Sequence, residues 1–243
     1  LTGGNGYAAI CVKPAYDSEW NYSESESAVL NISGDGSLKV IGGNGDQAGG
    51  RFGGGAGIGG NGEDQTGGDG VDFGTIRITK DFTGTVDAAG GSAGANEANP
   101  DYDNGNIFGG GAGIGSGGMQ GGSYDYNWGE VFGKILIENG TVLAQGNGYG
   151  AGIGGGLDAR GSGDVTVSGD AKLKVQGGVE DNIDGAGAGI GNGNILALVI
   201  QHIQGFLCRT QTRGVRHSAE VNTEHLRQRN SIGKCEIQPY RHR

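Results

Sequence analysis

The block Gly-Ala-Gly-Ile-Gly occurs four times in this chain of 243 residues, and self-similarity at long period is the signature of a repeat architecture. The blocks lie at residues 55–59, 111–115, 150–154 and 187–191. Before each block come two short runs in which apolar and polar residues mostly alternate, separated by a turn. Such alternation indicates a strand with one buried face. The chain therefore consists of similar units, each too small to bury a core alone.

Two architectures fit these units. In a parallel β-solenoid each unit is one coil of three short strands, equivalent strands stack, and the isoleucine of each block points inward. In the alternative, the paired runs form antiparallel hairpins, as the central Asn139-Gly140 suggests. The connection between the paired runs varies in length from unit to unit, which a hairpin register tolerates poorly. We therefore expect an all-β fold, a right-handed parallel β-helix or β-solenoid of about four irregular coils.

The composition changes abruptly near residue 193. Residues 1–193 hold 9 Lys and Arg against 24 Asp and Glu, whereas the last 50 residues hold 8 against 3 and only 3 of the 58 glycines. This change predicts a basic tail at 194–243. Before it we expect an aromatic and acidic segment or partial coil at 1–25 and Gly-rich solenoid repeats at 26–193. The first residue is Leu1, which suggests a mature or truncated fragment.

The basic tail is open to more than one interpretation. We expect it to be irregular or partly helical, with a short helix from Ser218 to Arg229. One interpretation makes the tail a non-native end, produced by a frame shift or a mis-joined sequence. The other makes it a small basic module that contacts an acidic partner.

Residue types exclude several functions. The apolar run at 195–200 is far shorter than the roughly 20 residues that a membrane span needs, so we expect no span. The acidic repeats are unsuited to nucleic acid, because phosphate contact needs basic residues. Residues 1–193 contain no His and only Cys11, so His-based triads and His/Cys metal sites are excluded there. We expect no enzyme and no cofactor other than calcium, with a β-helix polysaccharide lyase or hydrolase as an alternative.

A calcium site is the one metal site that the pattern suggests. Residues 59–64 and 67–72 match the Gly-Gly-x-Gly-x-Asp core of calcium-binding nonapeptide repeats. Asp64, Asp69 and Asp72 would supply hard oxygen ligands. The two matches are eight residues apart instead of nine and lack the apolar residue two places after Asp, so solvated turns are the alternative.

Three segments rich in aromatic and acidic residues lie outside the expected strands. A flat apolar ring beside short polar groups is what sugar recognition uses. The alternative is that the rings cover a flank of the fold or act as local clasps. The candidate glycan-binding residues are Tyr16, Trp20, Tyr22, Tyr102, Tyr124, Tyr126 and Trp128.

The combination of Gly-Ala-Gly-Ile-Gly-Gly with Gly-Thr-Val-x-Ala-x-Gly resembles the Gly-rich repeat regions of large secreted or cell-surface proteins of gut-associated bacteria. It is more loosely similar to calcium-dependent polysaccharide-binding β-helix domains of the pectate-lyase-like type. The resemblance covers about residues 26–193. It implies an extracellular or cell-surface, non-catalytic, adhesin-like segment that binds a polysaccharide or a host or matrix glycan. A purely structural spacer of a larger surface protein is the alternative.

Overall fold

The computed structural model describes residues 1–19, 21–45, 53–62, 71–93, 109–118, 131–157, 163–179 and 187–191, together with the strand residues 202–203, 206–207 and 218–222. These parts of the chain are rich in strands and contain no helix. The described residues therefore include no helix long and apolar enough to cross a membrane. Most of the strands belong to three sheets of parallel strands. This arrangement is compatible with the expected parallel β-helix.

Each sheet collects equivalent strands from successive units. The first sheet comprises β2 (Val29–Gly34), β5 (Thr75–Phe82), β8 (Lys134–Ile137) and β11 (Asp164–Val167). The second sheet comprises β3 (Ser37–Ile41), β6 (Thr85–Ala89), β9 (Thr141–Gln145) and β12 (Lys172–Gln176). The third sheet comprises β1 (Ile10–Cys11), β4 (Ile58–Gly59), β7 (Ile114–Gly115), β10 (Ile153–Gly154) and β13 (Ile190–Gly191).

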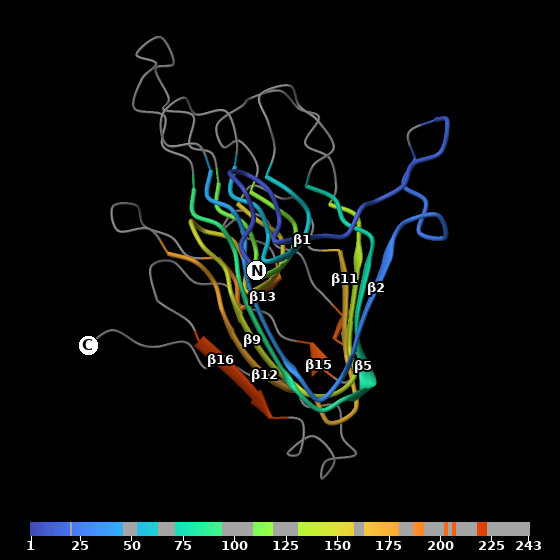
Figure 1. Cartoon of the computed structure of the whole chain (residues 1–243), viewed down its shortest axis with the longest axis vertical. Coiled ribbons are helices and arrows are strands. Elements are labelled where there is room, and N and C mark those ends of the chain that lie inside the picture. Colours follow the sequence, from blue (N-terminus) through green and yellow to red (C-terminus); the bar gives the residue numbers. More distant parts are fainter. Residues whose placement is uncertain are drawn as a thin grey trace, which may run out of the picture.

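One strand from each sheet makes up what we call a rung, and β2, β3 and β4 form the first rung. The first and second sheets diverge from the turns that join them like the arms of a V, and the short third sheet lies between the arms toward their open end (Figure 1). Consecutive strands such as β8 and β9 belong to different sheets, which excludes the antiparallel hairpin. The turn length can therefore vary without disturbing the pairing.

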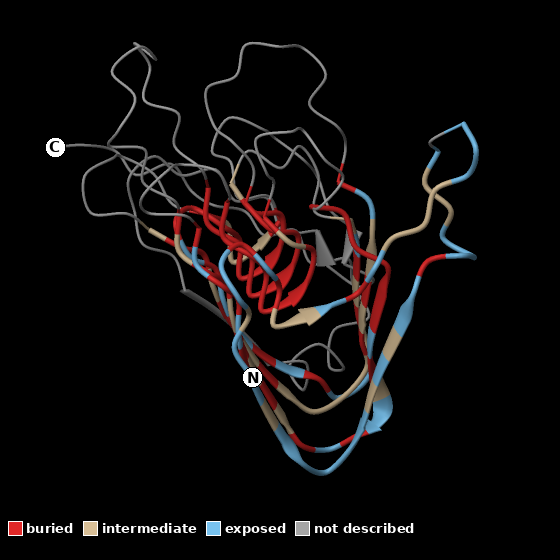
Figure 2. Ribbon diagram, turned by 45° about the horizontal axis from the view of Figure 1, so that its top comes forward, coloured by how far each residue is buried: buried red, intermediate tan, exposed pale blue. Residues whose placement is uncertain are grey.

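The third sheet places the isoleucines of the blocks directly above one another. Ile58 pairs with Ile114, Ile114 with Ile153, and Ile153 with Ile190, as the solenoid arrangement predicts. Ile58, Ile114 and Ile153 are fully buried. Ile10 in β1 extends the column by pairing with Ile58. Figure 2 shows the buried residues gathered along this sheet and interspersed with less buried ones along the two arms.

The glycines of the repeat allow two backbones to approach closely. A Cβ added at Gly90, just after β6, would lie 1.9 Å from the carbonyl oxygen of Gly111 at the start of the next block. The glycine that follows each block isoleucine has a positive φ, for example 135° at Gly115. Residues other than glycine rarely adopt this backbone conformation. Glycine is therefore required by the packing of the rungs and does not indicate disorder.

The described part of the tail adds three strands. β16 (Ser218–Asn222) pairs antiparallel with β12, and β14 (His202–Ile203) pairs antiparallel with β15 (Phe206–Leu207). Residues 218–222 therefore form a strand where the sequence predicts the beginning of a helix. The open edge of β12 offers backbone donors and acceptors that an isolated helix would leave unpaired. The remainder of the predicted helix lies outside the described residues.

Candidate functional site

A cluster of aromatic rings lies where the chain enters the first sheet. Three segments meet there: residues 13–28, which join β1 to β2, residues 71–74 before β5, and residues 131–133 before β8. We call the cluster of Tyr16, Tyr22, Asp72, Phe73 and Phe132 the aromatic corner. The segment that carries Tyr16 and Tyr22 projects from the side of the stacked rungs, above and to the right of β2 in Figure 1.

The rings of the aromatic corner contact one another in defined geometry. Tyr22 stacks on Phe132 with ring centroids 5.2 Å apart and an interplanar angle of 10°. Tyr16 meets Tyr22 edge-on, with centroids 6.4 Å apart and an angle of 76°. Both tyrosines are half-buried, whereas Phe132 keeps 37% of its surface exposed. The corner therefore presents an aromatic surface to solvent.

The carboxylate of Asp72 ties the three segments together. Its Oδ2 accepts a hydrogen bond from the Tyr16 hydroxyl, and its Oδ1 accepts one from the backbone N–H of Phe132 at 2.8 Å. The Tyr22 hydroxyl donates to the carbonyl of Phe73 at 3.3 Å. Asp72 is only 8% exposed, and hydrogen bonds to a buried carboxylate are worth about 1.5–3 kcal/mol each. Asp72 thus fixes the positions of two of the rings.

Phe73 fills the interior behind the corner, and two glycines provide its space. The ring is fully buried. A Cβ added at Gly133 would lie 2.4 Å from the Phe73 ring, and one added at Gly163 would lie 3.0 Å from it. Side chains at these two positions of the next rungs would therefore displace Phe73 and the corner that rests on it.

Local hydrogen bonds shape the loop that carries the tyrosines. Tyr16 and Tyr22 form an antiparallel bridge, and Asp17 Oδ1 accepts from the backbone N–H groups of Glu19 and Asn21 at 2.8 and 2.9 Å. These bonds lower the pKa of Asp17, and the bond from the Asn21 backbone N–H has the largest effect. At the base of the loop, Ser27 Oγ accepts from the N–H of Ala15 at 2.8 Å. The loop therefore has defined ends and a defined turn.

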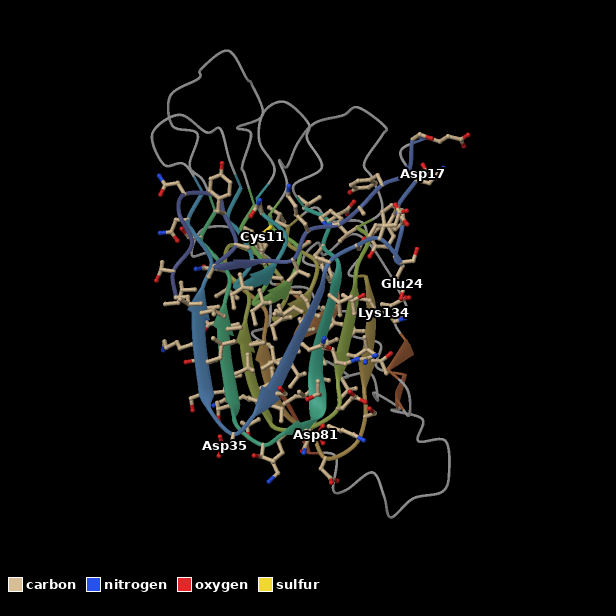
Figure 3. All side chains as sticks on the ribbon, turned by 45° about the vertical axis from the view of Figure 1, so that its right-hand side comes forward. Cys11, Asp17, Glu24, Asp35, Asp81 and Lys134 are labelled. Carbon is tan, nitrogen blue, oxygen red and sulfur yellow. The ribbon has the colours of Figure 1, made fainter. Side chains whose placement is uncertain are left out.

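Charged side chains border the corner. Lys134 Nζ lies 2.8 Å from Glu24 Oε1, which joins the first strand residue of β8 to the loop, as Figure 3 shows. The hydrogen bond and charge of Glu24 raise the pKa of Lys134. Burial is the main cause that raises the pKa of Tyr22, and the negative charges of Glu24 and Asp72 add to it. Tyr22 is therefore a neutral hydroxyl at physiological pH.

The structure brings together three of the predicted site residues, Tyr16, Tyr22 and Asp72. The sequence did not single out Phe132, although a Phe-Gly pair directly before the first strand recurs at 73–74 and 132–133 and was an available signal. The other candidates lie outside the described residues: Trp20, Tyr102, Tyr124, Tyr126, Trp128, Asp64 and Asp69.

The calcium prediction remains a prediction. Of its three carboxylates, only Asp72 is described, and both of its oxygens accept hydrogen bonds from within the chain. Among the described residues, no group of three His, Cys, Asp or Glu side chains is close enough to hold a metal ion.

The chain was also compared with known proteins. No protein-family model, curated protein or solved structure matches it.

Proposed function

We propose that this chain is a non-catalytic, extracellular repeat segment of an adhesin-like surface protein, and that it binds a polysaccharide or matrix glycan at the aromatic corner. Its fold is, in this proposal, a right-handed parallel β-helix whose rungs form a rigid support. The observation that carries the proposal is the stacked pair of Tyr22 and Phe132, held at the surface beside the Asp72 carboxylate.

The geometry of the corner supports glycan binding in two ways. The exposed ring of Phe132 offers an apolar face, and apolar faces combined with a few fixed polar groups are typical of ligand sites. The hydrogen bonds of Tyr16 and Tyr22 hold the rings in place before a ligand arrives, which lowers the entropic cost of binding. Because residues 1–193 are strongly acidic, we expect a neutral glycan to bind better than an acidic one.

The experiment is retention on an array of neutral and acidic polysaccharides. Phe132→Ala and Phe132→Leu both remove the ring, and the second keeps an apolar side chain. We expect each to weaken retention on the bound polysaccharide about tenfold, which corresponds to about 1.4 kcal/mol. Tyr7→Ala is the matched control, because Tyr7 is an exposed aromatic residue, 59% accessible, outside the corner. Equal retention by all variants that keep the parent's circular dichroism spectrum would refute the proposal.

A structural spacer is the second candidate function, and the hydrogen bonds of the corner favour it. Tyr16 and Tyr22 bond to groups of the neighbouring unit, so the loop also serves as a clasp across units. In this case Tyr16→Phe lowers the melting temperature, and no polysaccharide on the array retains the parent protein. The same array therefore separates the two functions: retention of the parent protein indicates glycan binding, and no retention indicates a spacer.

A further inference from the structure

Asparagine followed by glycine is the pair at which the main chain most easily attacks an asparagine side chain, because glycine has no Cβ to block the approach. Seven such pairs occur in the sequence, and five of them lie within the described residues. The five begin at Asn5, Asn44, Asn61, Asn139 and Asn147. In this reaction the backbone nitrogen of the glycine bonds to Cγ of the asparagine, so the hydrogen bonding of each glycine N–H decides which pair can react.

Four of the five pairs are built into the packing of the rungs, and their glycines are buried. The N–H group of each of these glycines donates a hydrogen bond of 3.0 Å or less. The four bonds are Gly6 N to Asn44 O, Gly45 N to Ser92 O, Gly62 N to Gly6 O and Gly148 N to Asn147 Oδ1. Each of these nitrogen atoms can therefore react only after the rungs open locally.

The pair Asn139-Gly140 lies outside this packing. It belongs to the turn between β8 and β9, among the turns that join the first sheet to the second at the closed end of the V (Figure 1). Both residues are half-buried. The carbonyl of Gly140 accepts from Lys172 N at 2.8 Å, whereas its N–H donates to no group in the described part of the chain. Of the five described pairs, this one alone presents a free backbone nitrogen beside the asparagine side chain.

The core itself requires the glycine of this pair. Gly140 has a φ of 81°, a conformation that residues with side chains rarely adopt. An added Cβ would also lie 2.4 Å from the ring of Phe82, which is only 2% exposed. A bulkier residue at this position would slow the attack on Asn139, but it would displace Phe82 from the core. The reactive pair is therefore retained by the packing beneath the turn.

We propose that Asn139 is a modification site of the folded protein, where spontaneous deamidation converts the side-chain amide to a carboxylate. Gly140 N bonds to Asn139 Cγ and gives its proton to water. The Cγ–Nδ2 bond then breaks, and Nδ2 takes up a proton from water and leaves as ammonia, so that a five-membered succinimide remains. Water opens this ring at either of its carbonyl groups, which gives aspartate or isoaspartate. Overall one water molecule enters and one ammonia leaves, with no oxidant or reductant.

The turn accommodates the product without loss of the fold. Isoaspartate adds one methylene to the main chain, and the turns already vary from two residues between β2 and β3 to four between β11 and β12. The modification removes one hydrogen bond, because Asn139 Nδ2 donates to the carbonyl of Lys80 at 2.9 Å and a carboxylate has no proton to donate. The modified protein therefore keeps its rungs and carries a new negative charge next to Glu138. This inference is independent of glycan binding.

The experiment is incubation of the full chain at mildly alkaline pH, followed by proteolysis and mass spectrometry of each peptide that holds an Asn-Gly pair. In the folded chain we expect Asn139 to deamidate at least about tenfold faster than any of the four buried pairs, a factor that corresponds to about 1.4 kcal/mol for opening the rungs. In urea the five pairs should react at similar rates, because their glycine N–H groups are then equally exposed. The same chain therefore supplies both the site and its internal controls.

Ser168→Asn is the matched variant. It creates a further Asn-Gly pair in the turn between β11 and β12, where Gly169 is exposed and its N–H donates to no described group. We expect this new pair to deamidate in the folded chain at a rate comparable to that of Asn139, while Asn44 in the same sample stays largely intact. The proposal is overturned if Asn139 reacts no faster than the four buried pairs in the folded chain, or if the pair made by Ser168→Asn stays intact over the same period.

Discussion

Gly90→Ala tests whether the glycines are required for contact between backbones. The added Cβ would lie 1.9 Å from Gly111 O, 2.5 Å from Gly111 C and 2.9 Å from Ala112 O. The first distance is about 1.5 Å shorter than ordinary van der Waals contact, and all three atoms belong to backbone that cannot rotate away. The second sheet must therefore move away from the block.

The cost of that movement follows from the bonds it strains. Gly90 N donates to Gln145 O at 2.9 Å, and Gly111 N donates to Gly91 O at 3.0 Å. Overpacking costs about 1–3 kcal/mol, and each buried hydrogen bond that is lost adds about 1 kcal/mol. We expect the free energy of unfolding to fall by about 3–5 kcal/mol, a large part of the roughly 5–15 kcal/mol of a typical domain.

Urea denaturation followed by circular dichroism measures this difference, and Gly36→Ala is the matched control. An added Cβ at Gly36 meets no atom within 4 Å, and its φ is not positive. That substitution should leave stability unchanged or raise it by about 0.4–1 kcal/mol, because alanine restricts the unfolded chain. If Gly90→Ala unfolds within about 1 kcal/mol of the parent, the close approach of the two backbones is not part of the fold.

Three further predictions concern the core and the aromatic corner. Ile114→Ala empties the centre of the isoleucine column and should cost about 2–5 kcal/mol in the same denaturation assay; a cost below about 1 kcal/mol would contradict its burial. Asp72→Ala removes the acceptor of Tyr16 and Phe132 and should cost about 2–3 kcal/mol with or without calcium; a loss seen only with calcium would favour a metal site. The raised pKa of Tyr22 means that its contribution to stability is complete below the unfolded value of about 10 and is lost as pH rises through the higher folded value. In a pH titration followed by tyrosinate absorbance, one component should therefore appear above the ordinary tyrosine pKa, and Tyr22→Phe should remove it. Persistence of that component in the variant would contradict its assignment to Tyr22.

The strands were predictable because their signal is local. The alternation in 164–167 and 172–175 is visible within four residues, and the structure has strands at both places. The four isoleucine blocks specified the stacking for the same reason, since identical blocks form identical pairs. By contrast, β1 adds Ile10 to the isoleucine column within the sequence Ala-Ile-Cys, which lacks the flanking glycines. The Gly-Ala-Gly-Ile-Gly pattern therefore did not predict this strand.

The aromatic corner could be predicted only in part, because it is made by contacts between distant segments. Tyr16 bonds to Asp72 across 56 residues, and Phe132 bonds to Asp72 across 60 residues. Aromatic and acidic composition identified Tyr16 and Tyr22 as unusual but gave no information on which rings would meet. Register supplies that information: residues 72–73 and 132 precede strands that pair in the first sheet. A sequence pattern without the pairing of β5 and β8 cannot place Phe132 beside Tyr22.

Equivalent isoleucines stack along the axis of the rungs, and nuclear Overhauser effects between their methyl groups measure this stacking. In a sample labelled only at isoleucine methyl groups, partners on adjacent parallel strands lie about 4.8 Å apart along the stack. The stacked fold predicts cross-peaks joining Ile58 to Ile114, Ile114 to Ile153, and Ile153 to Ile190, although these residues are far apart in the sequence. Absence of these cross-peaks in assigned spectra of the folded chain would contradict the stacked fold and the aromatic corner that rests on it.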